Sequence, residues 1–96
     1  MLVEVDKELQ DVFPIYIRNR QEDLMNMEAS LGRMDFDVLK QIGHKFAGNA
    51  DGYGLKVLGD LARDLEAQAK ERNMENCSQI VEKMKTYIKE IQLKFV

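Results

Sequence analysis

Apolar side chains recur at intervals of three and four residues in four separate stretches of this chain. The stretches cover residues 11–32, 35–50, 54–72 and 75–93. This spacing places the apolar side chains on one face of an α-helix. The pattern therefore predicts an all-α fold with four amphipathic helices. Because the connections are short, we expect antiparallel neighbours in an up-down-up-down four-helix bundle.

Residues that start or stop helices stand between these stretches. Asp11 is a candidate N-cap for the first helix, and Gly32 is a candidate stop signal at its end. Asn73 is expected to take the left-handed conformation that ends the third helix. Before the first helix, residues 1–10 are predicted to form a short helical arm, with Asp6 as its cap. No stretch of the sequence shows a strand pattern.

The second helical stretch contains the only histidine, His44, and it extends into a turn that is rich in glycine. His44 falls outside the apolar stripe, so its imidazole is expected to meet water. Gly43 and Gly48 lie inside the helical pattern, where a glycine costs about 1 kcal/mol relative to alanine. Two such costs beside an exposed histidine suggest that another molecule must come close to it. Gly48, one turn after His44, is the candidate access residue.

The spacing around this histidine resembles the motif of histidine phosphotransfer (HPt) domains. That motif has a phosphoacceptor histidine, a lysine three residues on, a glycine four on and a second glycine about ten on. His44, Gly48 and Gly54 match it, whereas Ala47 stands where the family usually has lysine. This departure leaves the rate of transfer and the preference for partners open.

The likeness extends to the flanking helices. Residues 12–24 are similar to the first bundle helix of small bacterial stand-alone HPt proteins, and residues 55–73 to their helix after the histidine. The resemblance implies one HPt-like domain over residues 1–96, with the phosphoacceptor hairpin at about 36–72.

The resemblance also implies a function. His44 would accept a phosphoryl group from the aspartate of a receiver domain, in a response regulator or a hybrid sensor kinase, and pass it to another receiver. Such a phosphocarrier has no autonomous catalysis and no cofactor of its own, since Mg²⁺ is expected on the partner receiver domain. Glu66 matches the position where HPt domains place a glutamate or glutamine against the imidazole, fixing its tautomer. An ordinary exposed glutamate that makes helix ion pairs is the equal alternative.

With Ala47 in the lysine position, another cation is expected to neutralise the phosphoryl group. Lys40 lies one turn before His44 on nearly the same face, and Lys45 follows it directly but points further round the helix. Either lysine could instead be a solvated surface residue. The surface for a receiver is expected to surround His44, with part of the first helix and with Asp37, Lys40, Gln41, Ala47, Gly48 and Asp51.

Composition narrows the class of protein. A net charge of −3 argues against a nucleic-acid partner, which calls for a basic face. No apolar run approaches the roughly 20 residues that span a bilayer. The acidic N-terminal residues lack the basic flank of a signal peptide, and one cysteine cannot form an internal disulfide, so we expect a cytoplasmic protein. We also expect a monomer. No second histidine or cysteine stands at ligand spacing, so no metal site is expected. The start at Met1 and the end at Val96 favour a chain that stands alone.

Two other classes of function fit the same fold. The protein could be a non-phosphorylated helical adaptor, or a sequestering inhibitor of a signalling protein, and the missing lysine keeps this alternative open. A purely structural bundle is the third, and it predicts no binding to receivers.

Overall fold

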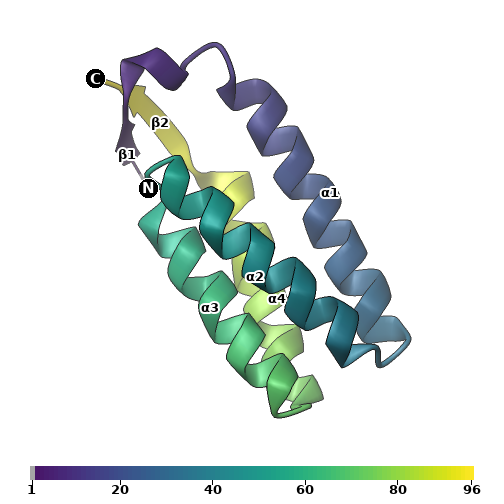
Figure 1. The fold of residues 1–96 in the computed structure, drawn as a ribbon. Helices are drawn as coiled ribbons and strands as arrows, with labels where there is room; N and C mark the ends of the chain where they lie inside the picture. Colours follow the sequence, from purple (N-terminus) through teal and green to yellow (C-terminus); the bar gives the residue numbers. More distant parts are fainter. Residues whose placement is uncertain (1) are drawn as a thin grey trace.

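The computed structural model describes residues 2–96, and four long helices make up most of it (Figure 1). They are α1 (Phe13–Gly32), α2 (Phe36–Gly52), α3 (Lys56–Lys70) and α4 (Met74–Glu90). The predicted four-helix bundle is therefore confirmed. None of these helices combines the length and the apolar character needed to cross a membrane.

Contacts between α2 and α3 show that the two helices run in opposite directions. His44 in the middle of α2 contacts Glu66 near the end of α3, and Asp51 near the end of α2 contacts Arg63 in the middle of α3. Residues later in α2 thus contact residues earlier in α3, as expected for antiparallel helices. Figure 1 shows the chain reversing direction at each of the three loops between helices.

Polar caps fix where α2 and α4 begin. The Asp35 side chain accepts a hydrogen bond from the backbone N–H of Val38, and the Asn73 side chain accepts one from that of Asn76. Asn73 was expected to be the left-handed residue that ends α3, and this prediction was wrong. Arg72 takes that conformation instead, with φ of 55°, which leaves Asn73 in an extended conformation suited to capping α4.

The predicted N-cap of the first helix was also wrong, because Val12 rather than Asp11 occupies that position and makes no side-chain cap. Pro14 lies in the first turn of α1, where a missing N–H costs nothing. The helix ends at Gly32, as predicted.

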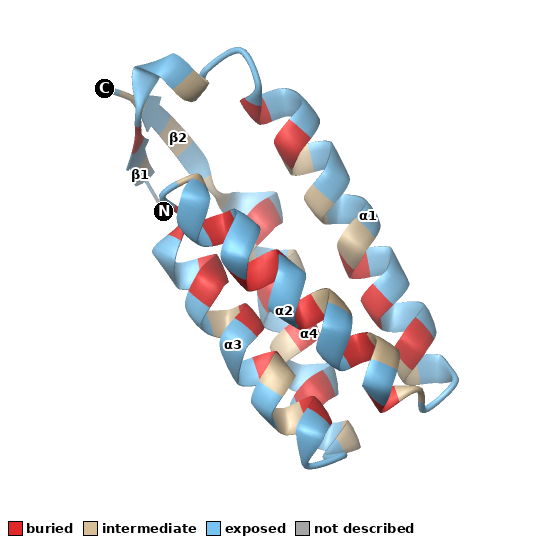
Figure 2. Cartoon of the chain, viewed as in Figure 1, coloured by how far each residue is buried: buried red, intermediate tan, exposed pale blue. Residues whose placement is uncertain are grey.

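The inward faces of the four helices form one hydrophobic core (Figure 2). Each helix contributes fully buried apolar side chains to it, among them Phe13, Met27, Leu39, Phe46, Leu58, Leu65, Cys77 and Met84. Cys77 is thus a core residue with a free thiol. Burial raises the pKa of that thiol, so it stays protonated and unreactive.

Two short strands at one end of the bundle were not predicted. β1 (Leu2–Val5) and β2 (Gln92–Phe95) pair in parallel, with Leu2 opposite Gln92. The chain therefore leaves the helical conformation at Glu90, before the expected end at about Leu93. Side chains alternate between inside and outside along both strands, a period that a helix cannot satisfy.

The predicted N-terminal helical arm was wrong for residues 2–5 and right only for the short 3-10 helix η1 (Lys7–Leu9) that follows them. Asp6 does cap this turn by accepting a hydrogen bond from the backbone N–H of Glu8. Met1, the first residue of the expected arm, lies outside the described residues.

Aromatic side chains join the strand pair to the bundle. The rings of Tyr16 and Tyr53 are stacked with centroids 3.9 Å apart, and Phe13 meets Tyr53 and Phe95 edge to face. Tyr53 thus packs at the end of the bundle. This cluster fixes the α2–α3 hairpin against α1 at the end of α2 that follows His44.

Candidate functional site

His44 projects from the middle of α2 into solvent. Its side chain is 75% exposed, whereas its neighbours Gly43 and Phe46 are buried. The apolar stripe of α2 faces the core and turns His44 outward, as the sequence predicted. A partner can therefore reach the ring without any rearrangement of the bundle.

Glu66 on α3 holds one edge of this ring. The Nδ1 atom of His44 lies 3.1 Å from Oε2 and 3.3 Å from Oε1 of Glu66. A carboxylate can only accept hydrogen bonds, so this contact requires a proton on Nδ1. In the neutral ring the lone pair is then on Nε2, the nitrogen suited to act as a nucleophile. The structure thus brings together the two residues that the sequence placed on different helices.

The two glycines that flank His44 have different surroundings. A Cβ atom at Gly48 would meet no atom within 4 Å, so the surface beside His44 is open there. A Cβ atom at Gly43 would lie 3.3 Å from the carbonyl oxygen of Ala62 and 3.5 Å from the backbone nitrogen of Glu66. No contact within the described chain therefore explains a glycine at position 48, whereas a side chain at position 43 would press on the backbone of α3.

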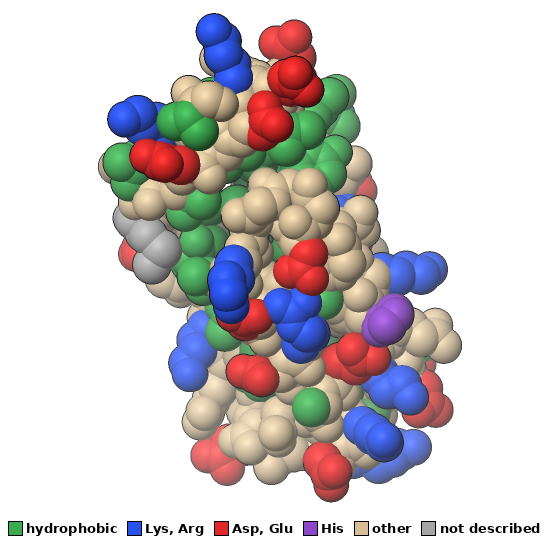
Figure 3. Space-filling view, turned by 60° about the vertical axis from the view of Figure 1, so that its left-hand side comes forward, with side chains coloured by type: hydrophobic (Ala, Val, Ile, Leu, Met, Phe, Trp, Pro, Cys, Tyr) green, Lys and Arg blue, Asp and Glu red, His purple; other side chains and the backbone are tan. Residues whose placement is uncertain are grey.

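A shallow hollow of about 330 Å³ lies beside the ring, lined by Lys40, Gln41, His44, Lys45 and Glu66. Figure 3 shows the histidine (purple) on a face that also carries acidic and basic side chains. Among the described residues, neither lysine has an ion-pair partner within 4 Å, so both charges are free to meet an anion. Both candidate cations line the hollow, and the choice between them stays a prediction.

Ala47 does not lie on the surface around His44, contrary to expectation. It is only 5% exposed and packs in the core on the same side of α2 as Gly43. Its position on the helix is the reason, since residues 43, 47 and 50 fall on one face. Ala47 therefore offers almost no surface to a partner.

The other expected surface residues are exposed, and two of them form ion pairs with arginines. Asp37 is 82% exposed and only 3.8 Å from Arg72, and Gln41 lines the hollow. Asp51 accepts a hydrogen bond from Nη1 of Arg63 at 2.6 Å, which ties it to α3.

Sequence reasoning missed the charged network to which Asp51 belongs. Arg63 also donates to Asp60, which accepts a second hydrogen bond from Lys56. The hydrogen bonds from Lys56 and Arg63 lower the pKa of the Asp60 carboxyl below its usual value. The Asp51 carboxylate lies over Gly59, filling the space that a side chain there would occupy. The signal was available: Gly59 sits on the inward face of a helix that is otherwise lined with leucine and alanine.

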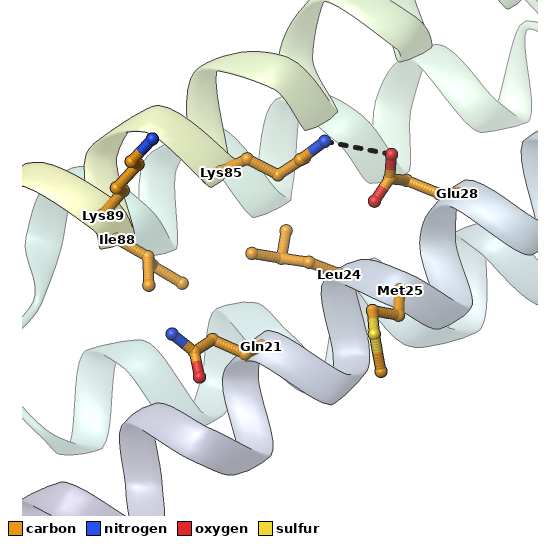
Figure 4. A pocket seen from close by; sticks show the side chains of 7 residues that line it. All are labelled: Gln21, Leu24, Met25, Glu28, Lys85, Ile88 and Lys89. Carbon is orange, nitrogen blue, oxygen red and sulfur yellow. Dashed lines mark hydrogen bonds and ion pairs between the residues drawn. The ribbon is translucent and has the colours of Figure 1, made fainter.

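A second hollow, of about 400 Å³, lies between α1 and α4, away from His44 (Figure 4). Leu24 and Ile88 form its apolar floor, and Lys85 spans it through an ion pair with Glu28 at 3.1 Å. No histidine or cysteine lines this hollow. Over residues 2–96 there is also no cluster of three or more histidine, cysteine or acidic side chains that could hold a metal ion.

Comparison with known proteins matches the chain to a domain family. No characterised protein and no solved structure gave a significant match to the chain. The sequence profile of the Hpt domain matches residues 11–94, a range that includes all four helices and both members of the His44–Glu66 pair. Hpt domains are phosphocarrier modules of two-component signalling, and they interact with receiver domains and histidine kinases. The chain belongs to the Hpt domain family.

Proposed function

We propose that this protein is a phosphocarrier in which His44 is the phosphoacceptor. The observation that carries the proposal is the exposed imidazole, held at Nδ1 by Glu66 so that the Nε2 lone pair is available. His44 is also the single histidine of the chain, so histidine phosphotransfer has no other candidate.

The transfer step follows from this geometry. The Nε2 lone pair attacks the phosphorus of an aspartyl phosphate on a receiver domain, and a bond forms between nitrogen and phosphorus. The bond from phosphorus to the aspartate oxygen breaks, and its electron pair returns to the carboxylate. The proton on Nδ1 stays on the ring, where the Glu66 carboxylate stabilises the positive charge that develops. Donation to a second receiver is the reverse of these events.

The remaining groups of the site act on the phosphoryl group or on the partner. Lys40, with Lys45 as the weaker candidate, neutralises charge on the phosphoryl oxygens. Gly48 leaves room for the receiver, and Asp37 and Gln41 contribute to the surface that it covers. The receiver brings the reacting carboxylate and its Mg²⁺, so this chain acts as a carrier, without catalysis of its own. We expect it to work as a monomer with a response regulator and a hybrid sensor kinase.

Incubation with phosphorylated receivers tests the proposal. A panel of receiver domains carrying radiolabelled aspartyl phosphate is mixed with the protein and with the His44→Gln variant. We expect label on the wild-type chain that is lost in acid and kept in base, and none on the variant. Receiver binding without transfer of label would contradict the proposal and favour the adaptor or inhibitor function. Absence of both binding and transfer would favour a structural bundle.

A further inference from the structure

Gly43 is the residue directly before His44, and none of the roles proposed above involves it. It lies on the buried face of α2, while His44 projects from the exposed face. A glycine in the middle of a helix is less favourable than alanine, so a reason for it is to be sought in its contacts.

Those contacts are all with the backbone of α3. A Cβ atom at position 43 would lie 3.3 Å from the carbonyl oxygen of Ala62, 3.5 Å from the nitrogen of Glu66 and 3.8 Å from its Cα atom. The first distance is tighter than ordinary contacts of a Cβ atom. A helix backbone cannot swing aside as the end of a flexible side chain can. A methyl group at position 43 would therefore push α3 away by a few tenths of an ångström, at the turn that carries Glu66.

The hydrogen bond to His44 has little tolerance for such a shift. Its two distances, 3.1 and 3.3 Å, are already at the long end for an N–H···O hydrogen bond. A retreat of α3 would bring them to about 3.5 Å, where the interaction is weak.

We propose that Gly43 is a positioning residue for the phosphoacceptor. By admitting the α3 backbone, it keeps the Glu66 carboxylate within hydrogen-bond distance of His44 and so keeps the ring proton on Nδ1. The inference rests on the proposed function, because it concerns the nitrogen that would attack phosphorus.

Gly48 provides a matched control. It belongs to the same helix and stands one turn after His44, but a Cβ atom there would meet nothing within 4 Å. Gly43→Ala and Gly48→Ala are therefore the same chemical change on either side of His44, and only the first presses on α3.

The single histidine makes the measurement direct, because its ring gives one pair of ¹⁵N resonances. Their chemical shifts at alkaline pH, where the ring is neutral, report which nitrogen carries the proton. We expect the wild-type protein to hold it on Nδ1. In Gly43→Ala the ratio of the Nδ1–H to the Nε2–H tautomer should fall roughly two- to fivefold, toward the value in Glu66→Ala, the range expected for loss of an exposed charged pair. Gly48→Ala should keep the wild-type ratio.

Thermal unfolding checks that each variant is folded, which we expect because each adds one methyl group and a better helix former. A wild-type tautomer ratio in folded Gly43→Ala would overturn the proposal and leave Gly43 as a packing residue only. This measurement uses neither receiver nor phosphate. Failure of the wild-type protein to accept phosphate would thus refute the proposed function without altering the result for Gly43.

A transfer assay tests whether Gly43 acts through Glu66. Gly43→Ala should slow receiver-to-His44 transfer in the wild-type background and add no further loss in the Glu66→Ala background, because the two changes remove the same interaction. Equal slowing in both backgrounds would show that Gly43 acts by another route and would contradict the proposal.

Discussion

Lys40 and Ala47 stand one turn before and one turn after His44, and of the two only Lys40 reaches solvent. We therefore predict that Lys40 replaces the lysine that the family usually carries at the position of Ala47. A cation acts most strongly in the transfer complex, where the receiver excludes water. Lys40→Ala should slow transfer by roughly three- to tenfold, and Lys45→Ala should slow it less.

Transfer from one radiolabelled receiver, followed in rapid-mixing experiments, measures both variants under the same conditions. Neither change should alter thermal stability, since both side chains are exposed and unpaired among the described residues. A greater loss in Lys45→Ala would place the phosphoryl group on the opposite side of the ring.

Substitutions at Glu66 should separate the effects of orientation and charge. Glutamine keeps an oxygen that can accept the Nδ1 proton, so Glu66→Gln should slow transfer only about two- to threefold. Glu66→Ala removes the acceptor and should slow transfer about five- to tenfold. Single-turnover rates with a cognate receiver measure both effects. Equal rates for the two variants would mean that ring orientation contributes nothing to transfer.

Gly48 should show opposite effects on stability and on transfer. Since a side chain there meets no other atom, Gly48→Ala should stabilise the fold by about 1 kcal/mol, which corresponds to about 4–8 °C in Tm. Gly48→Gln should also fold well, but its longer side chain should cover the ring and slow transfer. Calorimetry tests the expected gain in stability, and a transfer assay on the same preparations tests the expected loss of transfer rate. Unchanged transfer in Gly48→Gln would show that this glycine does not control access.

Tyr16 should make the fold sensitive to alkaline pH. Its hydroxyl is buried without a hydrogen-bond partner, and desolvation raises the pKa of Tyr16 from the usual 10.0 to about 12. The unfolded chain then loses this proton first. The fold is therefore fully stable with respect to this group below pH 10. As the pH rises toward 12, the free energy of unfolding falls by on the order of 2 kcal/mol.

In the variant Tyr16→Phe, the free energy of unfolding should fall less between pH 10 and pH 12 than in the wild type. It removes an unsatisfied buried hydroxyl and keeps the stacked ring, so its stability near pH 7 should equal or exceed that of the wild type. Urea unfolding at pH 7, 10 and 11.5 provides the comparison. An identical slope in the two proteins would assign the alkaline loss to other groups.

Helical periodicity was sufficient to predict the four helices and the exposure of His44, because both depend on side chains that repeat along one segment. The Asn73 prediction failed because a short polar side chain suits two neighbouring roles. In the structure the Asn73 side chain accepts a hydrogen bond from the backbone N–H of Asn76 and so caps α4. Contacts between α2 and α3 were harder to foresee. The position of Glu66 beside His44 was predicted from the family resemblance and not from the periodicity of the sequence. The ion pair between Asp51 and Arg63 has no periodic signature in the sequence.

The hydrophobic pattern of the sequence already distinguished the two glycines beside His44, although the prediction treated them alike. Gly43 falls on the apolar stripe and Gly48 outside it. A glycine on a buried face is accounted for by a neighbouring backbone, whereas one on an exposed face is not. The initial interpretation assigned both to the approach of a partner. The strands escaped prediction because each has only four residues, too few for an alternating pattern to stand out in the sequence.

The pairing of β1 with β2 also bears on the order in which the molecule assembles. Each helical hairpin closes a short loop, which is fast, whereas Leu2 and Gln92 meet only after almost the whole polypeptide has been arranged between them. We therefore expect the two strands to pair late in folding and to separate early when the native state fluctuates. Amide hydrogens of Lys7 and Val96, whose bonds extend this ladder, should exchange with solvent well before those of the bundle core.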